Sequence, residues 1–161
     1  MSRNRKLRPT SISMLLGAGL VAGVTVFSLT SVFIRSGANP VPIPFWLFLV
    51  PLVIGAVVIG QAWLVRQYRK GRRPVDQLYA ARIWVLTQAT SRGGTLMAGG
   101  ALGIAVAYYA GSATFLTDNG HNALLAGLAS IVMTIEALVG ERWCTYDDPG
   151  PDAAASANGV Q

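Results

Sequence analysis

Glu136 is the residue whose surroundings most suggest chemistry, because it lies inside an otherwise apolar stretch from Asn122 to Gly140. A carboxylate within a membrane-spanning helix is costly and requires a partner or water. Arg92 precedes another apolar stretch and lies at a comparable depth if the two stretches form antiparallel helices. We predict an ion pair between Arg92 and Glu136 near the membrane boundary, where long side chains reach toward water. The alternative is that Glu136 binds protons or a substrate.

The remaining reactive residue types form no recognisable catalytic or metal-binding constellation. His121 has no neighbouring ligands, and Cys144 is the only cysteine, which excludes an internal disulfide and any multi-cysteine metal site. Residues 17–22 match the pattern G-x-G-x-x-A, but they lie inside an apolar stretch, whereas a dinucleotide site requires a βαβ unit. We therefore expect no catalytic residue, no metal ligand and no cofactor.

The composition indicates a lipid-embedded protein. The chain has 161 residues, which corresponds to one domain, with 52% hydrophobic residues and 12% charged residues. Soluble domains carry about 25% charged residues, so too few charges are present to cover a surface in water. The net charge of +6 comes from basic clusters that flank apolar stretches, which is typical of membrane-orientation signals. We therefore expect no nucleic-acid partner.

Four apolar stretches are long enough to cross a bilayer. A helix needs about 20 residues to cross about 30 Å of hydrocarbon, and its backbone must form hydrogen bonds with itself. We predict an all-α integral membrane four-helix bundle within residues 12–146, with spans at about 12–34, 45–65, 93–113 and 122–140. The first stretch is longer than the hydrophobic region of a signal peptide, so we interpret it as an uncleaved anchor.

The segments between and beyond these spans have different compositions. Residues 76–91 mix polar and apolar types at helical spacing, which predicts an interfacial helix before the third span or a continuous extension of that span. Residues 1–11 form a basic N-terminus. Residues 147–161 are rich in small residues, acids, Pro and Gly, and are predicted to be a disordered tail.

Basic residues set the predicted orientation. They concentrate before the first span and between the second and third, whereas the opposite side carries only Arg35. Both termini are therefore predicted to be cytoplasmic. Tryptophans near the span ends are expected to act as interfacial anchors: Trp46 on the outer side, and Trp63, Trp84 and Trp143 on the inner side. The central basic run is predicted to contact anionic lipid headgroups through Arg66, Arg69, Lys70, Arg72 and Arg73.

Small residues predict how the spans pack. Helices in lipid associate through small residues that allow close approach of their backbones. The third span carries such residues at four-residue spacing, and the first contains a G-x-x-x-G pair. The predicted packing residues are Gly19 and Gly23 in the first span and Thr95, Gly99, Gly103, Ala107 and Gly111 in the third.

Several short segments resemble a known family. They are Leu7 to Ser11, Arg69 to Pro74, Ala80 to Arg82 and the closing Glu141-Arg142-Trp143-Cys144. Together they resemble an uncharacterised actinobacterial membrane family, domain of unknown function 3180, over about residues 7 to 146. The resemblance implies a small four-helix membrane protein, often encoded near folate-biosynthesis genes, with no assigned activity and no catalytic residues to carry over.

Three functions remain open from the sequence. The first is a non-enzymatic accessory or scaffold subunit of the bacterial plasma membrane whose partners are lipid and another membrane protein. The second is a small dimeric proton-coupled carrier that uses Glu136, and the third is a membrane enzyme of lipid or cofactor metabolism. The sequence does not predict an oligomeric state.

Overall fold

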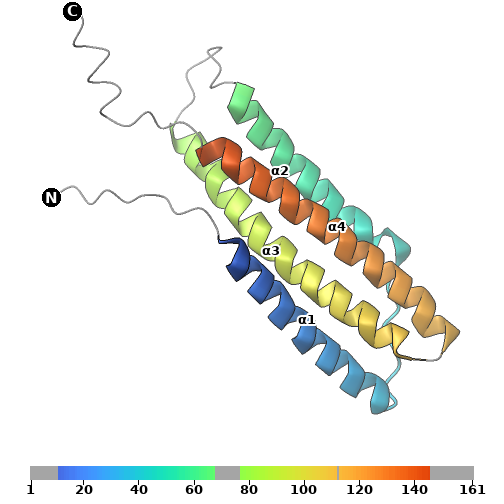
Figure 1. Ribbon diagram of the computed structural model, residues 1–161. Helices are drawn as coiled ribbons and strands as arrows, with labels where there is room; N and C mark the ends of the chain where they lie inside the picture. Colours follow the sequence, from blue (N-terminus) through green and yellow to red (C-terminus); the bar gives the residue numbers. More distant parts are fainter. Residues whose placement is uncertain (1–10, 68–76, 112, 146–161) are drawn as a thin grey trace, which may run out of the picture.

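The computed structural model describes residues 11–67, 77–111 and 113–145, without the side chains of 77–81, 144 and 145. Over these ranges the chain consists of helices and contains no strand, which confirms the all-α class (Figure 1). Four α-helices and one short 3-10 helix follow in order: α1 (Ile12–Arg35), η1 (Phe45–Phe48), α2 (Leu49–Gln67), α3 (Gln77–Tyr109) and α4 (Thr114–Thr145). Of the terminal segments assigned from sequence, residues 1–10 and 147–161 lie outside the described residues, as do Arg69, Lys70, Arg72 and Arg73.

Three of these helical segments are long and apolar enough to cross a membrane. They are Ile12–Arg35, Phe45–Gln67 and Thr114–Trp143. Helix α3 is not among them, because its apolar half is rich in glycine and follows Arg82 and Arg92. The third span therefore stays a prediction. The segment before it is continuous with it, since α3 runs unbroken for 33 residues, about 50 Å.

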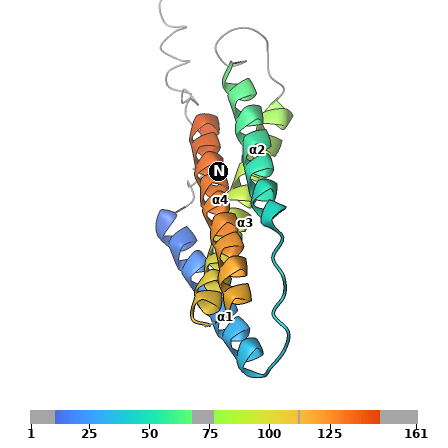
Figure 2. The ribbon, with the colours of Figure 1, turned by 90° about the vertical axis from the view of Figure 1, so that its right-hand side faces the viewer.

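The helices lie in the spatial order α1, α3, α4, α2 (Figures 1 and 2). Helices α3 and α4 form the centre and run antiparallel, so that Gln88 meets Glu141 and Gly94 meets Thr134. Helix α1 packs along α3, and α2 packs mainly along α4. In the described chain, no Cα atom of α1 lies within 8 Å of one in α2 or α4. The fold is thus open along the side between α1 and α4.

Small residues allow α1 and α3 to approach closely. A Cβ atom built on Gly23 would lie 3.1 Å from the Gly99 carbonyl oxygen, and one on Gly19 would lie 2.9 Å from the Thr95 methyl group. A Cβ on Gly99 or Gly103 would collide with the backbone of α1. The structure therefore brings five of the predicted packing residues into one interface. Ala107 is buried further along α3, and Gly111 contacts Leu116 just beyond that helix.

Hydrogen bonds connect the loop between α1 and η1 to the C-terminal end of α3 and to the N-terminal part of α4. The Ile43 N–H donates to Asn119 Oδ1 at 2.6 Å, and Asn122 Nδ2 donates to the Ile43 carbonyl oxygen at 2.9 Å. The Tyr108 hydroxyl donates to the Val41 carbonyl oxygen at 3.0 Å. Asn119 and Tyr108 are both buried, so this loop is an integral part of the fold.

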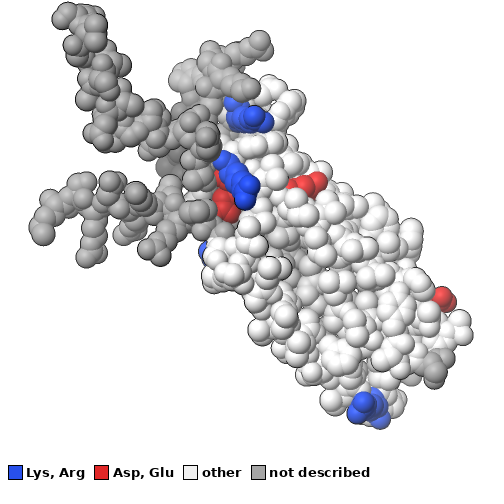
Figure 3. All heavy atoms as spheres, in the orientation of Figure 1, with Lys and Arg blue, Asp and Glu red and all other residues white. Residues whose placement is uncertain are grey.

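The outward surface is apolar over most of its length. Large hydrophobic side chains stay exposed along every described helix; Leu20 and Val21 of α1, for example, are 68% and 64% exposed. Figure 3 shows that charged side chains on the visible face gather toward the end of the bundle where α4 ends, with few at the opposite end. Such a surface matches a hydrocarbon environment flanked by polar layers.

Candidate functional site

Glu136 lies where α4 packs against α2. Its side chain is partly buried, and its Oε2 atom is buried without a hydrogen-bond partner among the described residues. The carboxylate fits here because the facing residue of α2 is Gly55, where an added Cβ would collide with Oε2 and lie 3.1 Å from the Met133 Cα. An unpartnered carboxylate at a helix contact is a costly arrangement.

The structure does not contain the predicted ion pair between Arg92 and Glu136. The antiparallel register of α3 and α4 places residue 92 beside residue 136, so the two residues lie at the same depth along the bundle, as the sequence suggested. The two side chains differ in rotation about their helix axes. Glu136 faces α2, whereas Arg92 is exposed and lies three residues before Thr95 on the side of α3 that packs on α1. Counting residues from the ends of the apolar stretches indicates how deep a residue lies, but not toward which neighbouring helix its side chain points.

A second acidic residue, Glu141, is more deeply buried than Glu136. It is 3% exposed, and Gln88 Nε2 donates to its Oε1 at 3.4 Å. Thr87 and Ser91 are fully buried on the same helix as Gln88, and each hydroxyl donates to the backbone of α3. Sequence reasoning missed this polar contact because Glu141 lies just past the apolar stretch, where an exposed residue is expected.

The tryptophans occupy different environments. Trp46 and Trp63 are 60% and 52% exposed, as an interfacial anchor requires, whereas Trp84 and Trp143 are half-buried. The Arg66 guanidinium lies 5.0 Å from the centroid of the Trp143 ring, a cation–π distance that connects the ends of α2 and α4. Arg66 is the only member of the predicted lipid-contacting run that the structure describes.

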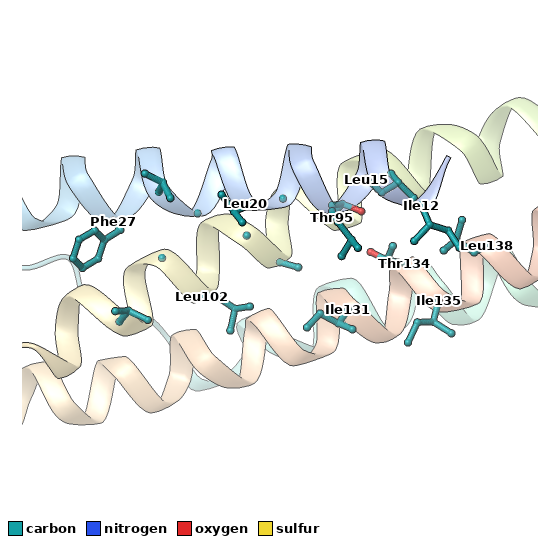
Figure 4. A pocket seen from close by; sticks show the side chains of 18 residues that line it. Ile12, Leu15, Leu20, Phe27, Thr95, Leu102, Ile131, Thr134, Ile135 and Leu138 are labelled. Atoms are coloured by element: carbon teal, nitrogen blue, oxygen red, sulfur yellow. The ribbon is translucent and has the colours of Figure 1, made fainter. Parts of the chain in front are cut away.

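An open groove of about 880 Å³ lies between α1 and α4, with α3 as its floor (Figure 4). Hydrocarbon side chains and glycines form nearly all of its lining; the exceptions are Thr95 and Thr134. Both threonine hydroxyls donate at 2.8 Å to backbone carbonyls of their own helices. The groove therefore offers no side-chain group for polar recognition along its length. Glu136 is not among its lining residues.

These features define the class of protein: an all-helical chain with three helices able to cross a membrane, an apolar outer groove and a carboxylate at a helix contact. Within the described residues, no group of three or more His, Cys, Asp or Glu side chains could hold a metal ion.

The comparison with protein families identifies the chain more narrowly. The family described as "Protein of unknown function (DUF3180)" matches residues 15–148, and the chain belongs to this family. No match was found among curated proteins. No solved structure matches the chain either.

Proposed function

We propose that this chain is a multi-pass protein of the bacterial plasma membrane, with both termini in the cytoplasm, that acts as a non-enzymatic accessory or scaffold subunit for another membrane protein. The three apolar helices and the outer surface, which is apolar over most of its length, support its place in a bilayer. The cluster of basic residues around the end of α2 and the start of α3 supports the orientation, since such residues stay on the cytoplasmic side.

The observation that carries the proposal is the apolar lining of the groove between α1 and α4. A carrier or enzyme needs polar groups that converge on a cavity. Here the groove is apolar, and the acid inside the apolar region points away from it, into the contact with Gly55. What the fold presents to its surroundings is a set of long apolar helix faces, and these are the surfaces through which membrane subunits associate.

Site-specific photo-crosslinking in native membranes tests the proposal. A photoreactive residue at Val21, which is exposed on α1, should yield a discrete crosslinked species that contains a second membrane protein. The matched control places the same residue at Asn39, an exposed position in the loop after α1. Purification in mild detergent should recover the same partner. A protein that crosslinks to no other polypeptide from any helix face and purifies alone contradicts the proposed role.

One observation favours a second function, that of a proton-coupled carrier. Carboxylates inside membrane-spanning helices occur in the proton relays of carriers, and the Oε2 atom of Glu136 is buried with no hydrogen-bond partner in the described part of the chain. Proton-coupled uptake of cationic solutes into proteoliposomes, abolished by Glu136→Gln, would establish the carrier in place of the scaffold. The position of Glu136, five residues before Glu141, lies closer to the end of α4 than the midplane sites of carriers.

A further inference from the structure

The groove between α1 and α4 has the shape and polarity of a site for a hydrocarbon chain. Side chains from both helices point toward one another across it, with Ile12 and Leu15 on one wall and Leu138 on the other (Figure 4). Its volume of about 880 Å³ falls within the range of about 300–1,000 Å³ for small-molecule sites. Because both lining threonines bond to their own helices, the occupant must be apolar along this length.

The groove is long enough to hold an acyl chain across one membrane leaflet. Its α1 wall extends from Ile12 to Phe27, about 22 Å at 1.5 Å per residue. One leaflet contributes about 15 Å of the hydrocarbon core, so an acyl chain that enters from the Ile12 end fits within the groove. That end is also the end where α4 finishes and where the proposed orientation places the cytoplasm.

Two arginines lie where the groove reaches this end. Arg142 follows Leu138 by four residues and Ile135 by seven, so it continues the α4 wall. Arg92 precedes Thr95 by three residues and Gly99 by seven, so it continues the α3 floor. Arg92 lies one turn past Gln88, the partner of Glu141, or about 6 Å deeper, a distance that a long arginine side chain covers by reaching toward the interface.

These arginines are available to an external anion. Both are exposed, and neither forms an ion pair within the described part of the chain. The nearby acids point elsewhere: Glu141 is buried against Gln88, and Glu136 faces α2. Arginine binds phosphate through paired N–H donors, which is the geometry that a phospholipid headgroup presents.

We infer that the groove binds one anionic phospholipid, with an acyl chain along α1, α3 and α4 and its phosphate between Arg92 and Arg142. This inference rests on the proposed membrane location and orientation. It adds a specific lipid site on the opposite side of α4 from Arg66 of α2, the one predicted headgroup contact that the structure describes. A transmembrane helix of a partner would also be apolar, but it would not account for two exposed arginines at one end of the groove.

Native mass spectrometry of the delipidated full-length protein in detergent tests the inference. We expect one tightly bound phosphatidylglycerol and much weaker binding of phosphatidylcholine with the same acyl chains. The double variant Arg92→Gln/Arg142→Gln should bind phosphatidylglycerol roughly thirty-fold more weakly, because it loses the electrostatic attraction of two arginines to the anionic headgroup. This factor corresponds to about 2 kcal/mol of binding free energy. The control Arg35→Gln removes an exposed charge at the other end of α1, away from the proposed phosphate site, and should change the affinity little.

A second pair of variants tests the acyl-chain part of the site. Ile131→Trp fills the groove from its α4 wall and should abolish the tight lipid, whereas Val57→Trp adds the same bulk at an exposed position of α2 and should retain it. Equal binding of both lipids, or unchanged binding in the arginine and Ile131 variants, would overturn the inference. So would loss of lipid in Ile131→Trp alone, since an apolar occupant without an anionic headgroup would explain that result.

Membrane insertion is measured separately, by alkaline extraction of the same variants from cell membranes. Variants that stay in the membrane pellet and elute as a single species in gel filtration are folded and inserted. If such a variant does not bind lipid, the lipid site in the groove is lost and membrane insertion is not. Release of the unmodified protein from the pellet would instead overturn the proposed function.

Discussion

At the contact of α2 with α4, the carboxylate of Glu136 lies where the Cβ atom of a larger residue at position 55 would stand, which explains why glycine is needed there. Any side chain larger than hydrogen at position 55 would displace the carboxylate. The expected ion pair with Arg92 is absent from the structure because the two residues share a depth but face different neighbours. Depth follows from counting 1.5 Å per residue, whereas the rotation of a helix apolar on all sides leaves no trace in its sequence.

Glu136→Gln should leave the protein as stable as the parent or make it more stable, by up to about 1 kcal/mol. The amide has nearly the same shape and still lacks a partner for one atom, but it removes a charge from an apolar contact. Thermal unfolding in detergent, followed by tryptophan fluorescence at neutral pH, measures the difference. A clear fall in Tm would reveal a partner that stabilises the charged carboxylate.

Gly55→Ala should destabilise the protein by about 1–3 kcal/mol, because the added methyl group forces α2 away from Glu136 and Met133. The control is Gly60→Ala on the same helix, where a Cβ has nothing within 4 Å. That change should be neutral or stabilising by up to about 1 kcal/mol, from the better helix propensity of alanine. Equal effects of the two substitutions on Tm would show that α2 does not pack on α4 through Gly55.

At the scale of elements, the small residues of α1 and α3 form the contact that holds α1 to the rest of the fold. Their spacing of four residues makes such a contact predictable, since it aligns them on one helix face. The groove beside this contact was not predictable. It arises because α1 packs only on α3 and leaves a gap toward α4, and no pattern within one helix encodes its distance from a helix that it does not touch.

Gly99→Ala should weaken the packing of α1 on α3 by about 1–3 kcal/mol, because the new methyl group meets the Gly19 carbonyl oxygen, which is backbone and cannot rotate away. Gly93→Ala lies on the same helix with open space at its Cβ position and serves as the control. We expect a lower Tm and faster proteolysis of α1 in the first variant only. Similar protease resistance in both would contradict the close α1–α3 approach.

The loop that precedes η1 gives a second test at this scale. Tyr108→Phe removes the hydrogen bond to the Val41 carbonyl oxygen and should destabilise the protein by about 1 kcal/mol. Backbone amides around Val41 should then exchange faster with solvent. Tyr109→Phe changes the adjacent tyrosine, which is exposed and contacts the His121 ring, and should affect neither quantity. Unaltered exchange in the Tyr108 variant would mean that the loop is held by Asn119 and Asn122 alone.

At the scale of the whole molecule, the all-helical class and three membrane-competent helices follow from long apolar stretches, because hydrophobic length is a property of local sequence. The sequence left open whether the segment before the third span is a separate interfacial helix or continuous with it, and in the structure α3 is continuous from Gln77. No proline or glycine lies between residues 77 and 92 to interrupt the helix. The order α1, α3, α4, α2 was beyond prediction. Helices apolar on every side can pack in many orders, and only side-chain fit at contacts such as Gly55–Glu136 selects among them.

The orientation of the whole molecule in the bilayer is measured by sided cysteine labelling. Cys144→Ser first removes the native thiol, and single cysteines then replace Asn39, exposed in the loop after α1, or Gln67, exposed at the end of α2. With a membrane-impermeant maleimide on intact cells, the cysteine at position 39 should react, and that at position 67 should react only after permeabilisation. Labelling at position 67 in intact cells, or equal labelling at both positions, would contradict a membrane protein with cytoplasmic termini.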